Sequence, residues 1–174
     1  MTSPKKPQAP RIVSSAHLVS ERSAELSEFE YGLIIANNAF QRWMLHCMAV
    51  AGEKGLGAQD ILVLHNVNHR ERAKRLADIC FALNVEDNHT VSYSLRKLMK
   101  MELVQGDRRG KEIFYSTTPK GAELCMRYRD VREQCLIASL EVLGIGNKEI
   151  GELAKVLRTL SGLYDQAARA AASL

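Results

Sequence analysis

The sequence has no long hydrophobic run and no paired cysteine motif. A membrane-spanning helix needs about 20 consecutive apolar residues, and the apolar runs here are only a few residues long, which excludes such a helix. No two of the four cysteines form a Cys-x-x-Cys pair, the spacing typical of zinc and dithiol sites. Because residues 1–10 hold no hydrophobic block of a secretory signal, we expect a cytoplasmic protein with reduced thiols.

The short motifs of the common enzyme classes are also missing. The sequence contains no Walker loop, no glycine fingerprint for a dinucleotide, no Gly-x-Ser-x-Gly elbow and no His-Glu-x-x-His pair. We therefore expect a protein that is not an enzyme, that has no catalytic residues and that needs no cofactor.

What is present is a folded chain with its positive charge in one stretch. Of the 174 residues 46% are hydrophobic and 25% are charged, which is typical of a globular protein. The net charge is +4, and the stretch between Asn66 and Lys111 accounts for all of it. Clustered positive charge predicts a polyanion partner, although chance clustering on a solvated surface is an alternative. The basic residues of this stretch are Arg70, Arg72, Lys74, Arg75, Arg96, Lys97, Lys100, Arg108, Arg109 and Lys111.

The first 56 residues divide into a tail and a long helix. Residues 1–19 carry three prolines and too little apolar surface to offset the entropy of ordering. We expect a mobile tail here, or a basic arm that touches nucleic acid. Apolar residues at spacings of three and four, such as Phe40, Met44 and Cys47, then predict a helix over residues 23–50.

Three shorter helices follow. The first starts near Ala58 and ends around His69, and the second covers residues 72–83, closed by Asn84, which tolerates the left-handed conformation of a helix end. Asp87 or Asn88 is a good N-cap for the third, which extends to about Met101. Val91, Ser94, Leu95 and Leu98 of this third helix share one face. The other face carries His89, Ser92, Tyr93, Arg96, Lys97 and Lys100.

The remainder predicts a basic hairpin and two more helices. A strand begins at residues 103–104, a charged turn covers residues 107–111, and residues 113–117 are rich in β-branched and aromatic residues typical of a return strand. Thr118 and Pro119 are suited to the N-cap and first position of a helix that ends near Gly144. Asn147 is the expected cap of a last helix with a wide apolar stripe.

This order predicts a mainly α (α+β) fold: a winged helix-turn-helix with a small β-hairpin wing and long flanking helices. Duplex DNA suits such a fold, because the major groove admits a helix and a basic hairpin tip can follow the backbone into the minor groove. The segments that carry a family resemblance are residues 87–98, the Leu103–Val104 strand, the Asp107–Arg109 wing and the Thr-Pro-Lys-Gly segment at residues 118–121. With these segments the chain resembles the multiple-antibiotic-resistance regulator (MarR) family of transcription regulators.

The resemblance implies a homodimer that binds a pseudo-palindromic operator on double-stranded DNA. Residues 20–56 and 119–174 would form the dimerisation helices, and residues 57–118 the DNA-binding domain. The apolar stripes of the last two helices agree with this assignment, because soluble monomers rarely expose such patches. The sequence departs from the family at Tyr93, Arg96 and Glu102, where an arginine, an acid and a glycine are common.

Position within the motif predicts the DNA contacts. Ser92, Tyr93 and Arg96 are the expected base contacts, with His89 and Thr90 near the start of the helix beside base or phosphate. For Tyr93 packing against the wing is the alternative, and for Lys97 and Lys100 a merely solvated face. The residues expected to contact the DNA backbone, directly or through the wing, are Arg72, Arg75, Lys97, Lys100, Arg108, Arg109 and Lys111.

Several alternatives stay open at this point. The chain could be a winged-helix interaction module without operator binding, or a regulator that senses metal or redox state. His65 and His69 have a metal-compatible spacing, but no partner ligands cluster nearby, and Cys47 lies on an apolar stripe where a thiol is inert. The family also implies a small-molecule effector pocket, which Tyr31, Trp43, His46 and His65 could line, although for Trp43 packing in the core is the favoured alternative.

Overall fold

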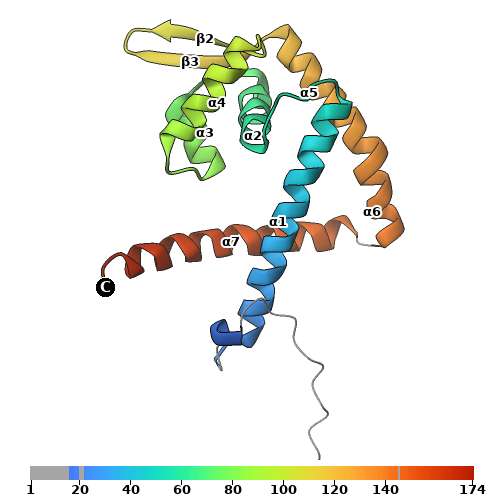
Figure 1. Ribbon diagram of the computed structural model, residues 1–174, viewed down its shortest axis with the longest axis vertical. Helices are drawn as coiled ribbons and strands as arrows, with labels where there is room; N and C mark the ends of the chain where they lie inside the picture. Colours follow the sequence, from blue (N-terminus) through green and yellow to red (C-terminus); the bar gives the residue numbers. More distant parts are fainter. Residues whose placement is uncertain (1–15, 20–21, 145) are drawn as a thin grey trace, which may run out of the picture. The chain divides into compact units, whose positions relative to one another are not determined.

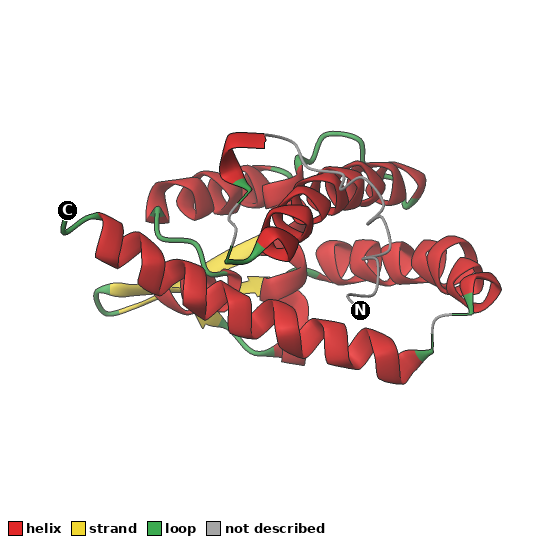
Figure 2. Ribbon diagram, turned by 90° about the horizontal axis from the view of Figure 1, so that it is seen from below, coloured by secondary structure: helices red, strands yellow, loops and turns green. Residues whose placement is uncertain are grey.

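The structure, a computed structural model, describes residues 16–19, 22–144 and 146–174 (Figure 1). The chain divides into two compact units, Met1–Tyr128 and Arg129–Leu174. Helices dominate the described chain, and its strands are confined to one small sheet (Figure 2). The predicted tail over residues 1–19 lies outside the described residues, apart from a 3-10 turn, η1, at Ala16–Leu18 and the residue after it. None of the helices in the described ranges has the length and hydropathy of a transmembrane segment.

Helix α1 (Ala24–Val50) confirms the long helix predicted over residues 23–50. Met44, Cys47 and Met48 near its C-terminal end are buried. Its middle is different: Phe40 is 51% exposed, and the other large apolar side chains of this part of the helix, Leu33, Ile34 and Ile35, are exposed as well. Of the large apolar side chains of α1, those buried in the core of the first unit therefore lie in its last turns.

Three helices and a hairpin make up the centre of the first unit. They are α2 (Ala58–Asn68), α3 (Leu76–Leu83), α4 (Asn88–Lys100), β2 (Val104–Arg109) and β3 (Glu112–Thr117). Helices α2, α3 and α4 gather beside the hairpin (Figure 1). Large side chains from all three helices are fully buried between them: Ile61, Leu64, Ile79, Leu95 and Leu98.

The sheet has three antiparallel strands in the order β1-β3-β2, where β1 is the short segment Lys74–Arg75. In the hairpin, Val104 lies opposite Thr117 and Arg109 lies opposite Glu112. The strands reach further than the sequence indicated, so that only residues 110 and 111 remain as the turn rather than all of residues 107–111.

The prediction of a helix from residue 72 was wrong in its start. A 3-10 turn, η2 (His69–Glu71), and strand β1 precede α3. Arg70 and Glu71 have positive φ angles of 61° and 49°, which no α-helix accommodates. The Asp78 carboxylate accepts a hydrogen bond from the Arg75 N–H at 3.2 Å and thereby caps the helix at Leu76. Pairing of β1 with β3 is a long-range interaction that apolar periodicity does not reveal.

The Thr-Pro-Lys-Gly segment connects β3 to α5 (Pro119–Arg132) and packs closely against the backbone just before β2. We call this close contact the joint behind the wing. The Thr118 N–H donates to the Leu103 carbonyl at 3.1 Å. As predicted, Thr118 caps α5, and its Oγ1 accepts from the Gly121 N–H at 3.1 Å. A Cβ on Gly121 would collide with the backbone carbonyl of Leu103, so only glycine fits this position.

Helices are the only regular secondary structure in the described part of the second unit. A π-helical turn, η3 (Glu133–Ile137), and α6 (Ala138–Leu143) continue from α5, and α7 (Asn147–Ala171) follows. Asn147 is the first residue of α7 rather than its cap, which is Gly146. No described residue of α7 is buried. The exposed large apolar side chains of α7 are Ile150, Leu153, Val156, Leu157 and Leu163.

Candidate nucleic-acid interface

Helix α4 is amphipathic in the way its sequence predicts. The Asp87 side chain accepts a hydrogen bond from the His89 N–H at 2.9 Å and caps the helix. One face packs into the core against α2 and α3, which leaves the opposite face for a partner. The buried residues are Val91, Ser94, Leu95 and Leu98.

The outer face of α4 brings together four of the five predicted base contacts. His89, Thr90, Tyr93 and Arg96 are exposed and line an open cavity of about 680 Å³. The fifth, Ser92, is half-buried and does not line this cavity. Tyr93 is 65% exposed, so most of its side chain is open to a partner.

Asp60, in the first turn of α2, lines the same cavity and is nearly fully buried. Its Oδ1 accepts from Ser94 Oγ at 2.7 Å, and its Oδ2 accepts from Lys97 Nζ at 2.6 Å and from the Gly57 N–H at 2.9 Å. Burial by itself raises the pKa of Asp60, but the hydrogen bonds from Lys97, Ser94 and Gly57 outweigh burial, so that this pKa lies below its usual value. Asp60 is therefore ionised and holds the Lys97 ammonium.

The tip of the wing is cationic and open. Gly110 has a φ of 64° at the turn, a conformation that favours glycine. Arg108 and Lys111 beside it are exposed. The Arg109 guanidinium lies 4.8 Å from the centre of the Phe114 ring, and its Nε donates to Asp107 at 2.8 Å. These two contacts orient Arg109 along the hairpin and leave its side chain 58% exposed.

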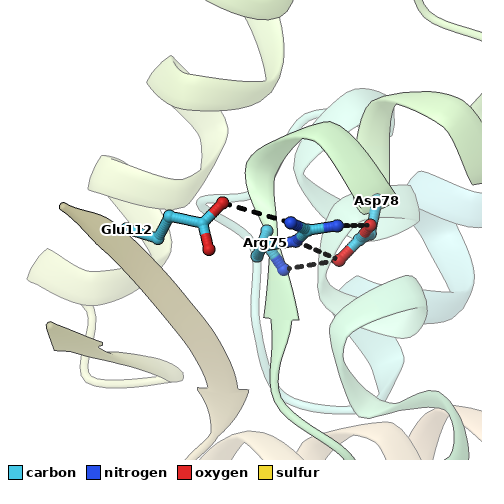
Figure 3. Close-up of polar contacts among 3 residues, drawn as sticks. All are labelled: Arg75, Asp78 and Glu112. Atoms are coloured by element: carbon cyan, nitrogen blue, oxygen red, sulfur yellow. Dashed lines mark hydrogen bonds and ion pairs between the residues drawn. The ribbon is translucent and has the colours of Figure 1, made fainter. Parts of the chain in front are cut away.

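Arg75 joins the start of α3 to the wing (Figure 3). Its guanidinium forms ion pairs with Asp78 at 3.0 Å and with Glu112, the first residue of β3, at 3.1 Å. The hydrogen bonds to Asp78 and Glu112 raise the pKa of Arg75, and the hydrogen bonds from Arg75 lower the pKa of Asp78. A phosphate would have to compete with two carboxylates for this side chain.

Lys74 shows that not every cation of the basic stretch faces a partner. It is buried, and its ammonium donates to the backbone carbonyls of Val67, His69 and Arg72 at 3.1, 2.6 and 3.3 Å. Burial, together with the nearby charges of Arg72 and Arg70, lowers the pKa of Lys74. Lys74 thus stabilises the turn between α2 and α3, and its charge is not displayed on the surface for a partner.

Two of the remaining cations, Arg72 and Lys100, are exposed and are not held by a carboxylate of the described residues. Arg72 lies in the segment between η2 and β1, and Lys100 is the last residue of α4. Neither side chain forms an ion pair with any residue that the structure describes. Both are available for phosphate.

The histidines and cysteines do not gather into a metal or redox site. Within the described ranges no three metal-ligating side chains lie together. His65 is half-buried with its ring against Tyr128, the two ring centres 4.5 Å apart, whereas His69 is exposed. Cys47 is buried, and its Sγ donates to the Tyr128 carbonyl at 3.5 Å. Of the other residues expected in an effector pocket, Tyr31 and Trp43 are half-buried and His46 is exposed.

Sequence reasoning missed Asp60 and Lys74. For Asp60 a signal existed: an acid three residues after Gly57, just before an apolar run, has the spacing of a helix cap. That spacing predicts the Gly57 hydrogen bond but not the two partners on α4. For Lys74 no local signal existed. The carbonyls of Val67, His69 and Arg72 meet at its ammonium in a turn that contains the positive φ angles of Arg70 and Glu71.

The comparisons with known proteins agree with this geometry. Residues 56–121 match the family profile of a winged helix DNA-binding domain. No curated protein sequence matches the chain.

Many solved structures have the same fold. MarR of Staphylococcus aureus in complex with salicylate and kanamycin is 15% identical, with a TM-score of 0.64 over 84% of this chain and 95% of that chain. A MarR variant of E. coli in complex with operator DNA is 17% identical, with a TM-score of 0.64 over 81% and 99%. The repressor CouR, bound to a 23-mer DNA duplex, is 22% identical, with a TM-score of 0.64 over 80% and 96%. The resemblance seen in the sequence is thus confirmed as a shared fold.

Proposed function

We propose that this chain, a winged-helix protein with the fold of the MarR family regulators, is a sequence-specific DNA-binding transcription regulator that works as a homodimer in the cytoplasm. The observation that carries the proposal is the outer face of α4, where His89, Thr90, Tyr93 and Arg96 line one open cavity. A helix with such a face, capped at its N-terminus and backed by a rigid core, is suited to the major groove.

Base reading is assigned to the outer face of α4. Arg96 is exposed and forms no ion pair with a described residue, so its guanidinium is available for the two acceptors of a guanine. Such a bidentate contact contributes about 1–3 kcal/mol of discrimination. Tyr93 and Ser92 would contact neighbouring bases, and His89 and Thr90 the base or phosphate at the start of the helix.

Backbone contacts are assigned to the cations around this face. Arg108, Arg109 and Lys111 at the wing tip would follow the backbone toward the minor groove, where arginine is favoured by the concentrated negative potential. Arg72 and Lys100 would bind phosphates beside α4. Arg75 belongs to the predicted set as well, but its two carboxylate partners must first yield to a phosphate.

Dimerisation is supported by the apolar surface outside the DNA-binding domain. The middle of α1 exposes Phe40 and its neighbours, and α7 exposes Leu153 and other members of its stripe. A soluble chain rarely leaves contiguous patches of this kind uncovered. We propose that a second copy covers them and that the two-fold axis makes the operator pseudo-palindromic.

We also propose that the chain responds to a small molecule. MarR of S. aureus was solved with salicylate and kanamycin, which supports a search for an effector of this chain. Tyr31, Trp43, His46 and His65 remain the residues we propose for its pocket.

The experiment is a binding titration of the full chain against duplex DNA from upstream of its own gene. We expect Arg96→Ala to reduce the preference for this upstream duplex over a scrambled duplex by about tenfold or more, because a bidentate contact is lost. Arg109→Ala should weaken both duplexes alike and flatten the salt dependence. Arg158→Ala on α7 is the matched control. Equal binding of both duplexes by the native chain would favour an interaction module instead.

A further inference from the structure

The Asp60 carboxylate has two partners on α4 that lie one turn apart. Ser94 donates to one oxygen at 2.7 Å, and Lys97 donates to the other at 2.6 Å. Both contacts reach from the rigid start of α2, where the Gly57 N–H also holds the carboxylate. Two fixed points on one helix restrict its rotation about its own axis as well as its distance from α2.

Rotation of α4 decides what the DNA meets. Successive residues of an α-helix are turned by about 100°, so a modest rotation would replace one set of outward side chains by its neighbours. Tyr93 and Arg96 each directly precede a residue held by Asp60. The anchors therefore lie at the part of α4 where base contacts are proposed, not at a distant end.

The Asp60 carboxylate also holds the Lys97 ammonium, which would otherwise be available to a phosphate. The Lys97 side chain is 33% exposed and the Asp60 side chain 7% exposed, so the ion pair lies at the margin of the protein. A lysine released from this position would lie on the outer surface of α4 close to a bound phosphate backbone. Phosphate contacts raise affinity for every sequence and carry no sequence information.

We propose that Asp60 is a positioning residue for DNA recognition: it fixes the rotation of α4 and keeps Lys97 away from the phosphate backbone. The inference rests on the proposed function, because it concerns how the same helix reads DNA. It revises the role expected for Lys97 from the sequence, which was a backbone contact.

A merely structural role for Asp60 makes a different prediction. If the carboxylate only caps α2 through Gly57, its loss would lower the stability of the chain and the amount of folded protein. It would not change the number of phosphates that the folded protein contacts. The salt dependence of binding counts those contacts and therefore distinguishes the two roles.

The test compares four variants of the full chain with the native protein on a selected and a scrambled duplex over a range of salt concentrations. The variants are Asp60→Asn, Asp60→Asn with Lys97→Met, Ser94→Ala, and the control Glu123→Gln. The control removes the exposed ion pair between Glu123 and Arg127 on α5, which is 2.7 Å long. Urea unfolding of each variant establishes the fraction of folded protein.

For Asp60→Asn we expect the slope of log affinity against log salt to steepen by about 0.9 per subunit, the value for one added phosphate contact. The scrambled duplex should bind several-fold more tightly, and selectivity should fall by about tenfold, the loss expected when a bidentate base contact is misaligned. The double variant should return to the native slope. Ser94→Ala, which removes an anchor without changing charge, should lower selectivity with the native slope and keeps the test valid if Asp60→Asn does not fold.

Failure of the inference and failure of the function give different results. If Asp60→Asn binds with native slope and native selectivity, or if Ser94→Ala keeps native selectivity, the positioning role is overturned while DNA recognition stands. A steeper slope that persists in the double variant also overturns the role assigned to Lys97. If the native chain binds no duplex at all, the proposed function fails and this inference fails with it.

Discussion

Gly121 provides the sharpest test of the joint behind the wing. A substitution to alanine would place a Cβ against the carbonyl of Leu103, which is backbone and cannot rotate away. That carbonyl also accepts the hydrogen bond of the Thr118 N–H at 3.1 Å, and Leu103 itself is buried. The alanine can be accommodated only if the start of α5 moves away from β2.

The expected cost follows from these contacts. Overpacking of a closely packed site costs about 1–3 kcal/mol, and loss of the Thr118 hydrogen bond adds about 1 kcal/mol. The better helix propensity of alanine offsets about 1 kcal/mol. We therefore expect Gly121→Ala to lower the free energy of unfolding by about 2 kcal/mol, within the range of these contributions.

Urea unfolding at neutral pH measures this change, and Gly151→Ala is the matched control. Gly151 lies inside α7, and nothing lies within 4 Å of a Cβ built on it. The same chemical change should therefore stabilise the chain there by about 1 kcal/mol. A Gly121→Ala protein as stable as the native chain would refute the proposed joint.

Three further predictions concern stability and thiol reactivity. Glu102 has a φ of 58° at the end of α4, so Glu102→Gly should raise the free energy of unfolding by about 1 kcal/mol; its exposed contact with Lys120, 3.9 Å long, contributes little. Burial lowers the pKa of His65, so as the pH falls the unfolded chain takes up a proton on this histidine before the folded chain does. The free energy of unfolding should therefore decrease below about pH 6.5, by at most about 1.4 kcal/mol per pH unit. Unfolding free energies between pH 7.5 and 5.5 should show this loss in the native chain but not in His65→Phe. Burial raises the pKa of Cys125 to about 11, so a thiol reagent at pH 8 should modify the exposed Cys135 first, and Cys135→Ser should remove the fast phase.

Much of the fold could be predicted from the sequence because it rests on local signals. The Asp87 cap, the buried face of α4 and the hairpin all follow from neighbouring residues. The start of α3 could not be predicted, because Lys74 and Arg75 form a short strand instead of helix and pair with a strand about 40 residues further along the chain. The π-helical turn at η3 lies in a stretch whose pattern is also compatible with a plain α-helix.

The candidate site could be predicted as a set of exposed residues but not as a network. Helical position identifies Tyr93 and Arg96 as outward-facing, and both are exposed. Charge counting does not tell an available cation from an engaged one, and Lys97 and Arg75 are both held by carboxylates from other elements. Those partners become neighbours only through tertiary packing.

In the proposed function, the outer face of α4 in a dimer reads a two-fold DNA site. The most direct measurement is selection of duplexes from a random pool by the native full chain, followed by determination of the binding stoichiometry. We expect two related half-sites whose centres are about 10 base pairs, one helical turn, apart, with two chains per duplex. A pool that remains random after selection, or a site read by a single chain, would rule out the proposed function.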